Sequence, residues 1–165
     1  MVTGATASAA GLTPTVVVCL VVAFVQTAAL WWLYFGVLAE RAHVTLSTCE
    51  DPGRLARDAY TYLHLPIVAG IIATAVGTDL LIAEPHHSLH GVGLAMMLGG
   101  PALFLVGEVS FGRRMAGTTD VSRLVVAGCL LLLVPIGGQV SALLLAVTVG
   151  ALLTALVLWE LERRP

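Results

Sequence analysis

Long apolar runs separated by short polar segments dominate the chain. Five such runs cover residues 14–38, 56–77, 89–109, 123–136 and 139–159. All but the fourth reach the ~20 apolar residues that an α-helix needs to cross a bilayer. Thr13 and Pro14 open the first run with residue types that favour a helix N-cap and first turn. The pattern predicts an all-α, polytopic bundle of five transmembrane helices that forms a single domain over residues 1–165.

The polar segments between the runs differ in their basic residues, which indicates an orientation. All eight basic side chains are arginines, and with five spans they fall on one side of the membrane. They are Arg41, Arg54, Arg57, Arg113, Arg114, Arg123, Arg163 and Arg164. The positive-inside rule assigns that side to the cytoplasm. We therefore expect an external N-terminus, a cytoplasmic C-terminus and a place in the bacterial cytoplasmic (inner) membrane.

Composition narrows the functional class. The chain is 58% hydrophobic and 11% charged, and its mean hydropathy is +0.97. These values predict an integral membrane protein whose main partner is the lipid bilayer. No basic cluster suggests a nucleic-acid partner, and Cys19, Cys49 and Cys129 lack the spacing of a disulfide framework or zinc site. No HExxH, phosphate-binding loop or Ser-His-Asp order is present, so we do not expect an enzyme.

The second run begins with titratable side chains at positions where membrane helices usually carry Leu or Val. Asp58, Tyr60, Tyr62 and His64 precede Pro66. Such groups are costly at membrane depth and usually face protein or water. Because Pro66 has no N–H, the Tyr62 carbonyl needs a partner outside the regular helical ladder. Two interpretations stay open, a polar path for a ligand or ion and hydrogen bonds that hold helices together.

Small residues in the second and third runs predict closely packed helices. Gly70, Thr74 and Gly77 form a strip that another helix can approach closely. Gly99 and Gly100, followed by a proline, are expected to break the third helix near its middle. Broken helices are a feature of transporters, although glycine and proline are also frequent in ordinary membrane helices.

Polar and aromatic side chains of the first run are further candidates for a polar path or a helix interface. Gln26 lies near the middle of the run and predicts an interhelical hydrogen bond of ~1 kcal/mol. Trp31, Trp32 and Tyr34 cluster near its far end, which is typical of an aromatic belt at the membrane surface.

Glu108, in the last turn of the third run, is expected to pair with Arg113 and Arg114 at the interface. Glu84, His86, His87 and His90 occupy the second loop, where adjacent histidines satisfy no specific ligand geometry. We therefore favour a solvated loop and expect no metal and no cofactor. A haem on His64 is disfavoured because no second histidine lies deep in another run.

Three segments carry a family resemblance. They are ALWWLYF at 29–35, RLARDAYTYLHLPIVAG at 54–70 and AVG at 75–77. Over residues 16–164 the chain resembles the C-terminal half of the bacterial low temperature requirement protein A family. Its members are polytopic membrane proteins, typically more than twice this length. Gly36 stands where the family usually has an aspartate, and the N-terminal half is absent.

The resemblance implies a role in growth or membrane adaptation at low temperature, with no known reaction. The chain is then a truncated or split member, or it replaces the missing half by self-association or a second membrane subunit. The leading functional hypothesis is a transporter- or channel-like protein in which Gln26, Asp58, Tyr62 and His64 line a polar path. The alternative is a structural or assembly subunit without transport activity.

Overall fold

The computed structural model describes residues 11, 13–38 and 58–163, and the side chains at 37–38, 58–60 and 116 lie outside that description. The named elements within these ranges are all helical, with η marking π-helical turns. They are α2 (Pro14–Leu33), η1 (Tyr34–Leu38), η2 (Asp58–Leu63), α5 (His64–Ala83), α6 (Gly91–Ala116), α7 (Val121–Leu132), α8 (Val134–Gly137) and α9 (Ala142–Glu162).

Within the described ranges, four helices are long and apolar enough to cross a membrane, namely Pro14–Gly36, Thr61–Ala83, Gly91–Met115 and Ala142–Glu162. A shorter apolar helix covers Val121–Gly137. The prediction of an all-helical membrane protein is therefore confirmed at the level of helix type, length and hydrophobicity.

Two helices extend further than predicted. The second continues to Ala83 instead of ending near residue 77, and Thr78 bonds back to the carbonyl of Thr74 within it. The third continues to Ala116 instead of residue 109 and remains α-helical through Pro101, so the predicted break is absent. It stops where Gly117 adopts φ +67° and donates its N–H to the Arg113 carbonyl, a common helix ending.

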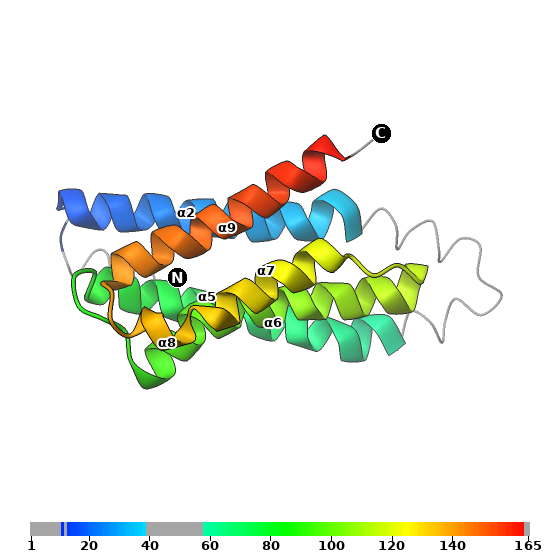
Figure 1. Ribbon diagram of the computed structural model, residues 1–165, viewed down its shortest axis with the longest axis horizontal. Coiled ribbons are helices and arrows are strands. Elements are labelled where there is room, and N and C mark those ends of the chain that lie inside the picture. The colour runs from blue at the N-terminus through cyan, green and yellow to red at the C-terminus, as the bar shows by residue number, and fades with distance from the viewer. Residues whose placement is uncertain (1–10, 12, 39–57, 164–165) are drawn as a thin grey trace.

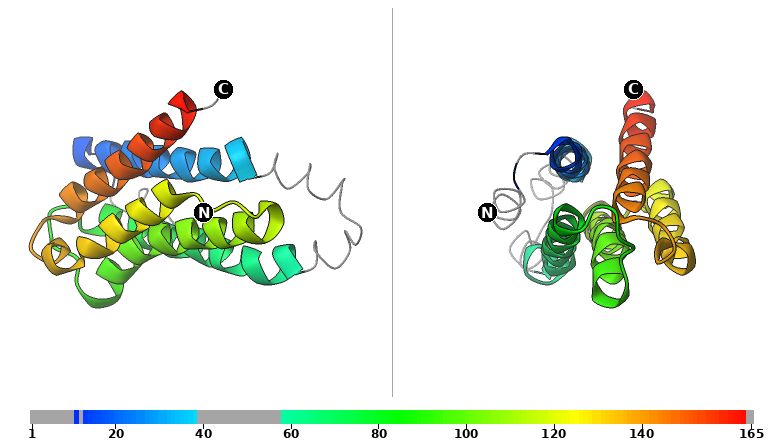
Figure 2. Two further views of the ribbon diagram at one scale, coloured as in Figure 1. Left: turned by 45° about the vertical axis from the view of Figure 1, so that its right-hand side comes forward. Right: turned by 90° about the vertical axis from the view of Figure 1, so that its left-hand side faces the viewer.

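The helices form two layers, and α6 lies in the middle of one of them. Successive long helices run in alternating directions, and α9 leans across α2 (Figure 1). The end-on view places α5, α6 and α7 in one layer, with α2 and α9 on the other side (Figure 2). In its most apolar stretch α6 is 61% buried, against 39% for each of α2, α5 and α9. The central helix is therefore α6, and the others leave one face toward lipid.

The small-residue strip of α5 packs against α6 of the same chain. A Cβ added at Gly70 would lie 2.5 Å from the Phe104 backbone nitrogen, and one at Gly100 would lie 2.6 Å from the Thr74 nitrogen. A Cβ added at Gly77 would lie 2.8 Å from the Cα of Met97. These residues let two backbones approach closely. The strip is therefore occupied within one chain and is not free to bind a second copy.

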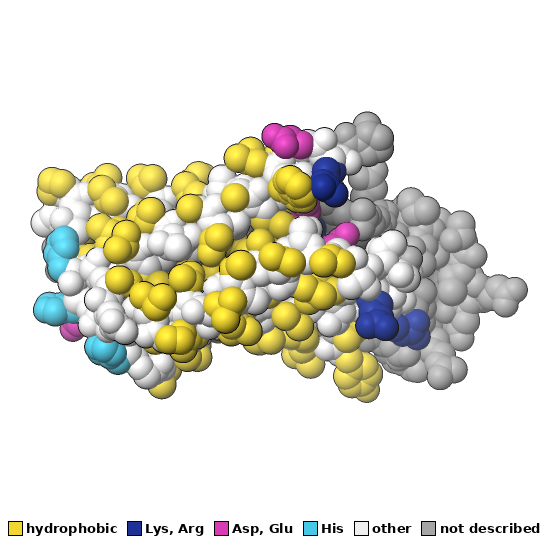
Figure 3. Space-filling view, in the orientation of Figure 1, with side chains coloured by type: hydrophobic (Ala, Val, Ile, Leu, Met, Phe, Trp, Pro, Cys, Tyr) yellow, Lys and Arg dark blue, Asp and Glu magenta, His cyan; other side chains and the backbone are white. Residues whose placement is uncertain are grey.

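The two ends of the bundle differ in their charged and titratable side chains. Figure 3 shows histidines at one end and basic side chains at the other. The histidine end is the loop between α5 and α6, which is held against the start of α9 by a 2.8 Å hydrogen bond from the Ala142 nitrogen to the His87 carbonyl. His87 lies 3.8 Å from Glu84 on the surface. In the described part of the chain, no three His, Cys, Asp or Glu residues are placed to hold a metal.

Candidate functional site

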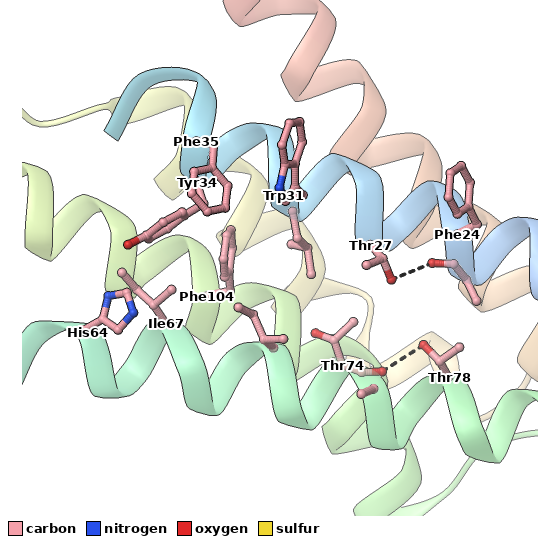
Figure 4. A pocket seen from close by; sticks show the side chains of 14 residues that line it. Phe24, Thr27, Trp31, Tyr34, Phe35, His64, Ile67, Thr74, Thr78 and Phe104 are labelled. Atoms are coloured by element: carbon pink, nitrogen blue, oxygen red, sulfur yellow. Dashed lines mark hydrogen bonds between the residues drawn. The ribbon is translucent and has the colours of Figure 1, made fainter. Parts of the chain in front are cut away.

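A cavity of about 700 Å³ lies between α2 and α5, with Phe104 of α6 in its wall (Figure 4). Three of its rim residues, Phe24, Trp31 and Phe35, are exposed, so the cavity opens on the side of the bundle. Small-molecule sites in proteins typically measure ~300–1,000 Å³ and are mostly apolar with a few polar groups. Both the size and the lining fit that description.

One end of the cavity is formed by two side chains from different helices, Tyr34 and His64. Their rings meet edge to face with centroids 5.6 Å apart (Figure 4). The ring centroids of Phe35 and Tyr34 are 4.8 Å apart, and those of Phe111 and His64 are 6.5 Å apart. Edge-to-face packing of this kind fixes ring orientation. The phenol and the imidazole are thereby held at the cavity, where each can exchange hydrogen bonds with a bound molecule.

Three threonines add polar groups along the walls. Thr27 donates its hydroxyl to the Ala23 carbonyl at 2.9 Å, Thr74 to Gly70 at 2.8 Å, and Thr78 to Thr74 at 2.9 Å. Each hydroxyl hydrogen is therefore directed into its own helix, while the oxygen keeps a lone pair for another donor. Since no carboxylate or guanidinium lines the cavity among the described residues, its walls suit an uncharged, weakly polar molecule.

The structure separates several of the predicted path residues from this cavity. Gln26 does not line the cavity; it is buried and donates its Nε2 to the Ala146 carbonyl of α9 at 2.7 Å. Trp32 lines a shallower groove on the α9 side, and Tyr62 is exposed on the outer surface. Pro66 is half-buried beside Gly107. The side chains of Asp58 and Tyr60 lie outside the described residues. Among the described residues, three of the candidates named from the sequence for a polar path or a helix interface line the cavity: Trp31, Tyr34 and His64.

A buried charge cluster lies behind the aromatic end of the cavity. Arg123 donates its Nη1 to Glu108 Oε2 at 2.7 Å, and its Nε and Nη2 to the two carboxylate oxygens of Glu160 at 2.8 and 2.9 Å. Nη2 also lies 3.3 Å from the Leu33 carbonyl of α2. Arg123 and Glu108 are each 1% exposed. The cluster therefore links α2, α6, α7 and α9 through one guanidinium.

This pairing corrects the partner predicted for Glu108. Arg113 and Arg114 are close in sequence, but both side chains are exposed at the end of α6. The chain reverses at Gly117 and starts α7 at Val121, so the first turn of α7 returns alongside Glu108. Because a buried carboxylate needs a buried cation, the arginine brought back by this reversal is its partner.

Sequence reasoning also missed Arg123 and Glu160 as members of a site. Both stand near the ends of apolar runs, where charged residues ordinarily face the aqueous phase. The sequence shows only that Arg123 stands three residues after Asp120, within the first turn of a helix. This position does not reveal that Arg123 pairs with Glu160, which is 37 positions away. The contact arises from helix packing.

The cavity and the charge cluster share neighbouring residues. Glu108 follows Phe104 of the cavity wall by one turn of α6. Leu33, whose carbonyl faces Arg123, directly precedes Tyr34 of the cavity. The two sites are therefore adjacent along both α2 and α6.

Comparisons with known proteins agree with the resemblance of the segments at 29–35 and 54–77. An uncharacterised protein of Rhizobium meliloti (strain 1021) is 34% identical over 138 residues, which make up 83% of this chain and 34% of that protein. The chain thus spans about a third of the length of this curated relative. No solved structure matches. Residues 1–158 match the family described as bacterial low temperature requirement A protein (LtrA), and the chain belongs to this family.

Proposed function

We propose that the chain is a transporter- or channel-type membrane protein, or one part of such a protein, without enzymatic activity. The cavity between α2 and α5 receives a small, uncharged solute. The observation that carries the proposal is the cavity itself, of about 700 Å³, with Tyr34 and His64 at one end. A role of this activity in growth or membrane adaptation at low temperature is part of the proposal, and the family description supports it.

The lining explains the class of solute. A molecule that leaves water for membrane depth must replace its hydrogen bonds. The threonine oxygens, the Tyr34 hydroxyl and the His64 ring supply such partners along an otherwise apolar wall. A fully charged solute would find no countercharge among the described lining residues, so its desolvation would be uncompensated.

Solute entry into proteoliposomes tests the proposal. We expect glycerol or urea to enter vesicles that contain the wild-type protein faster than empty vesicles, and potassium chloride not to do so. His64→Ala should slow entry by about tenfold, as expected if ~1.4 kcal/mol of solute stabilisation is lost. Ala75→Trp, which fills the cavity, should slow it at least as much. Entry is followed by light scattering after an osmotic step.

Ala95→Trp is the matched control, because Ala95 is exposed on α6 and does not line the cavity. If both tryptophan variants slow entry equally, the cavity is not the route. If wild-type vesicles are no faster than empty ones for every solute, the structural-subunit alternative is favoured. That alternative has its own support, since Gln26 and Glu108 are both engaged in helix–helix contacts.

We further propose five spans in the bacterial inner membrane, with the N-terminus outside and the C-terminus in the cytoplasm. Arg113 and Arg114 at the end of α6 and Arg163 at the end of α9 support a single basic side (Figure 3). The short helix Val121–Gly137 is about 25 Å long at 1.5 Å per residue, slightly below the ~30 Å hydrocarbon thickness. Local thinning or flanking side chains accommodate such a mismatch.

Reporter fusions test this topology. A fluorescent protein fused after Pro165 should fold and fluoresce, because it remains in the cytoplasm. Alkaline phosphatase fused at the same position should be inactive, and it should be active when inserted in the loop between α5 and α6. The reverse pattern of activities would refute the orientation.

Self-association, or assembly with a second membrane subunit, is also part of the proposal. The chain spans about a third of its curated relative, and the cavity opens sideways between α2 and α5. A further membrane segment against that opening would separate the cavity from lipid. The strip at Gly70 and Gly77 is already covered by α6, so the contact is expected elsewhere on the surface.

A further inference from the structure

The buried cluster contains one guanidinium and two carboxylates. Arg123 holds Glu160 with two parallel hydrogen bonds, from Nε and Nη2, which is the strongest geometry for an arginine–carboxylate pair. The third bond, from Nη1, reaches a single oxygen of Glu108. One positive charge therefore faces two acidic groups, and the pair with Glu160 already balances it.

Glu108 is the surplus acid, and its surroundings disfavour a negative charge. Its side chain is 0% exposed, whereas that of Glu160 is 15% exposed. Glu108 Oε1 is buried and accepts no hydrogen bond from the described residues. An ionised carboxylate in this position would carry an excess charge with one of its oxygens unsolvated, which is costly in a low-dielectric interior.

Within the described part of the chain, the other groups around Glu108 supply no second cation. At the N-cap of α7, Asp120 adds negative charge near the cluster, and α2 contributes the Leu33 carbonyl, which accepts a hydrogen bond from Arg123. At the C-cap of α9, the Arg163 guanidinium lies over the Trp159 ring, 4.1 Å from its centroid. On α5, the His64 ring packs against Phe111, one turn beyond Glu108.

We propose that Glu108 binds a proton in the folded protein at neutral pH. The O–H bond forms at Oε1, while Oε2 continues to accept from Arg123, so the cluster as a whole becomes neutral. A metal cation fits this site less well, because hard cations require several oxygen ligands and the described residues present one free oxygen. The protonation stands independently of solute transport. If the cavity does carry a solute, this proton lies one helical turn from its wall.

Infrared spectroscopy of the purified protein in lipid nanodiscs tests the proposal. We expect a carbonyl band from a protonated carboxylic acid at neutral pH, with the downshift in D₂O that such groups show. Glu108→Gln should remove the band, and Glu162→Gln, which changes an exposed carboxylate on α9, should leave it. Glu160→Gln should also remove it, because Arg123 is then left with Glu108 alone and that acid ionises.

The wild-type spectrum decides the main point without any variant. Absence of a protonated-acid band in the folded protein would overturn the proposal, and so would a band that persists in Glu108→Gln. A band that disappears when choline chloride is replaced by sodium chloride would identify a bound cation instead. Persistence of the band in Glu160→Gln would refute the charge-balance argument. Loss of solute flux alone moves none of these readouts.

Discussion

Replacing Arg123 by methionine is expected to leave little folded protein. The substitution leaves Glu108 and Glu160 against each other in the interior without a cation. Removing one partner of a buried ion pair typically costs about 3–5 kcal/mol, and whole domains are stable by only about 5–15 kcal/mol. The bond to the Leu33 carbonyl that ties α2 to the cluster is also lost. The measurement is the yield and melting temperature of the protein in mild detergent.

Arg113→Met is the matched control, since Arg113 is exposed at the end of α6 and its loss should change stability by less than about 1 kcal/mol. A triple variant with Arg123→Met, Glu108→Gln and Glu160→Gln removes the guanidinium and both acidic groups and should recover much of the loss. Equal melting temperatures for Arg123→Met and Arg113→Met would show that the cluster does not hold the helices together.

The second large effect is expected at Gly100 of α6, whereas its neighbour Gly99 should tolerate the same substitution. A Cβ at Gly100 would lie 2.6 Å from the nitrogen of Thr74 and 2.7 Å from its Oγ1, whereas a Cβ at Gly99 meets nothing within 4 Å. Because the obstacle is backbone, α5 and α6 must separate to admit the methyl group. We expect Gly100→Ala to destabilise the protein by about 1–3 kcal/mol. Gly99→Ala should be neutral or slightly stabilising, since alanine favours the helix.

Equilibrium unfolding in mixed micelles measures this difference, and equal stabilities of the two alanine variants would contradict the close contact. Gly70→Leu extends the test, because a larger side chain would be forced against Phe104. We expect it to unfold the chain. A folded Gly70→Leu monomer that merely fails to self-associate would mean that the strip binds a second copy instead of α6.

The long apolar helices and the class of protein follow from the sequence for a simple physical reason. The bilayer requires runs of about 20 apolar residues with internally paired backbones, and this requirement is local. Local sequence features also predicted the start of α2 at Pro14 and the close approach of another helix at Gly70 and Gly77. The segments around Trp31 and His64 carry enough specific pattern to indicate the family, which the match over residues 1–158 confirms.

The site depends on the tertiary structure, because side chains distant in sequence meet only after helices choose their neighbours. Gln26 and His64 both looked like path residues, but the rotation of α2 turns Gln26 toward Ala146 and leaves Tyr34 facing His64. Arg123 looked like a surface charge until the reversal at Gly117 carried it into the bundle. Apolar run length is a property of each helix alone, whereas the cavity and the cluster depend on how helices rotate and pair.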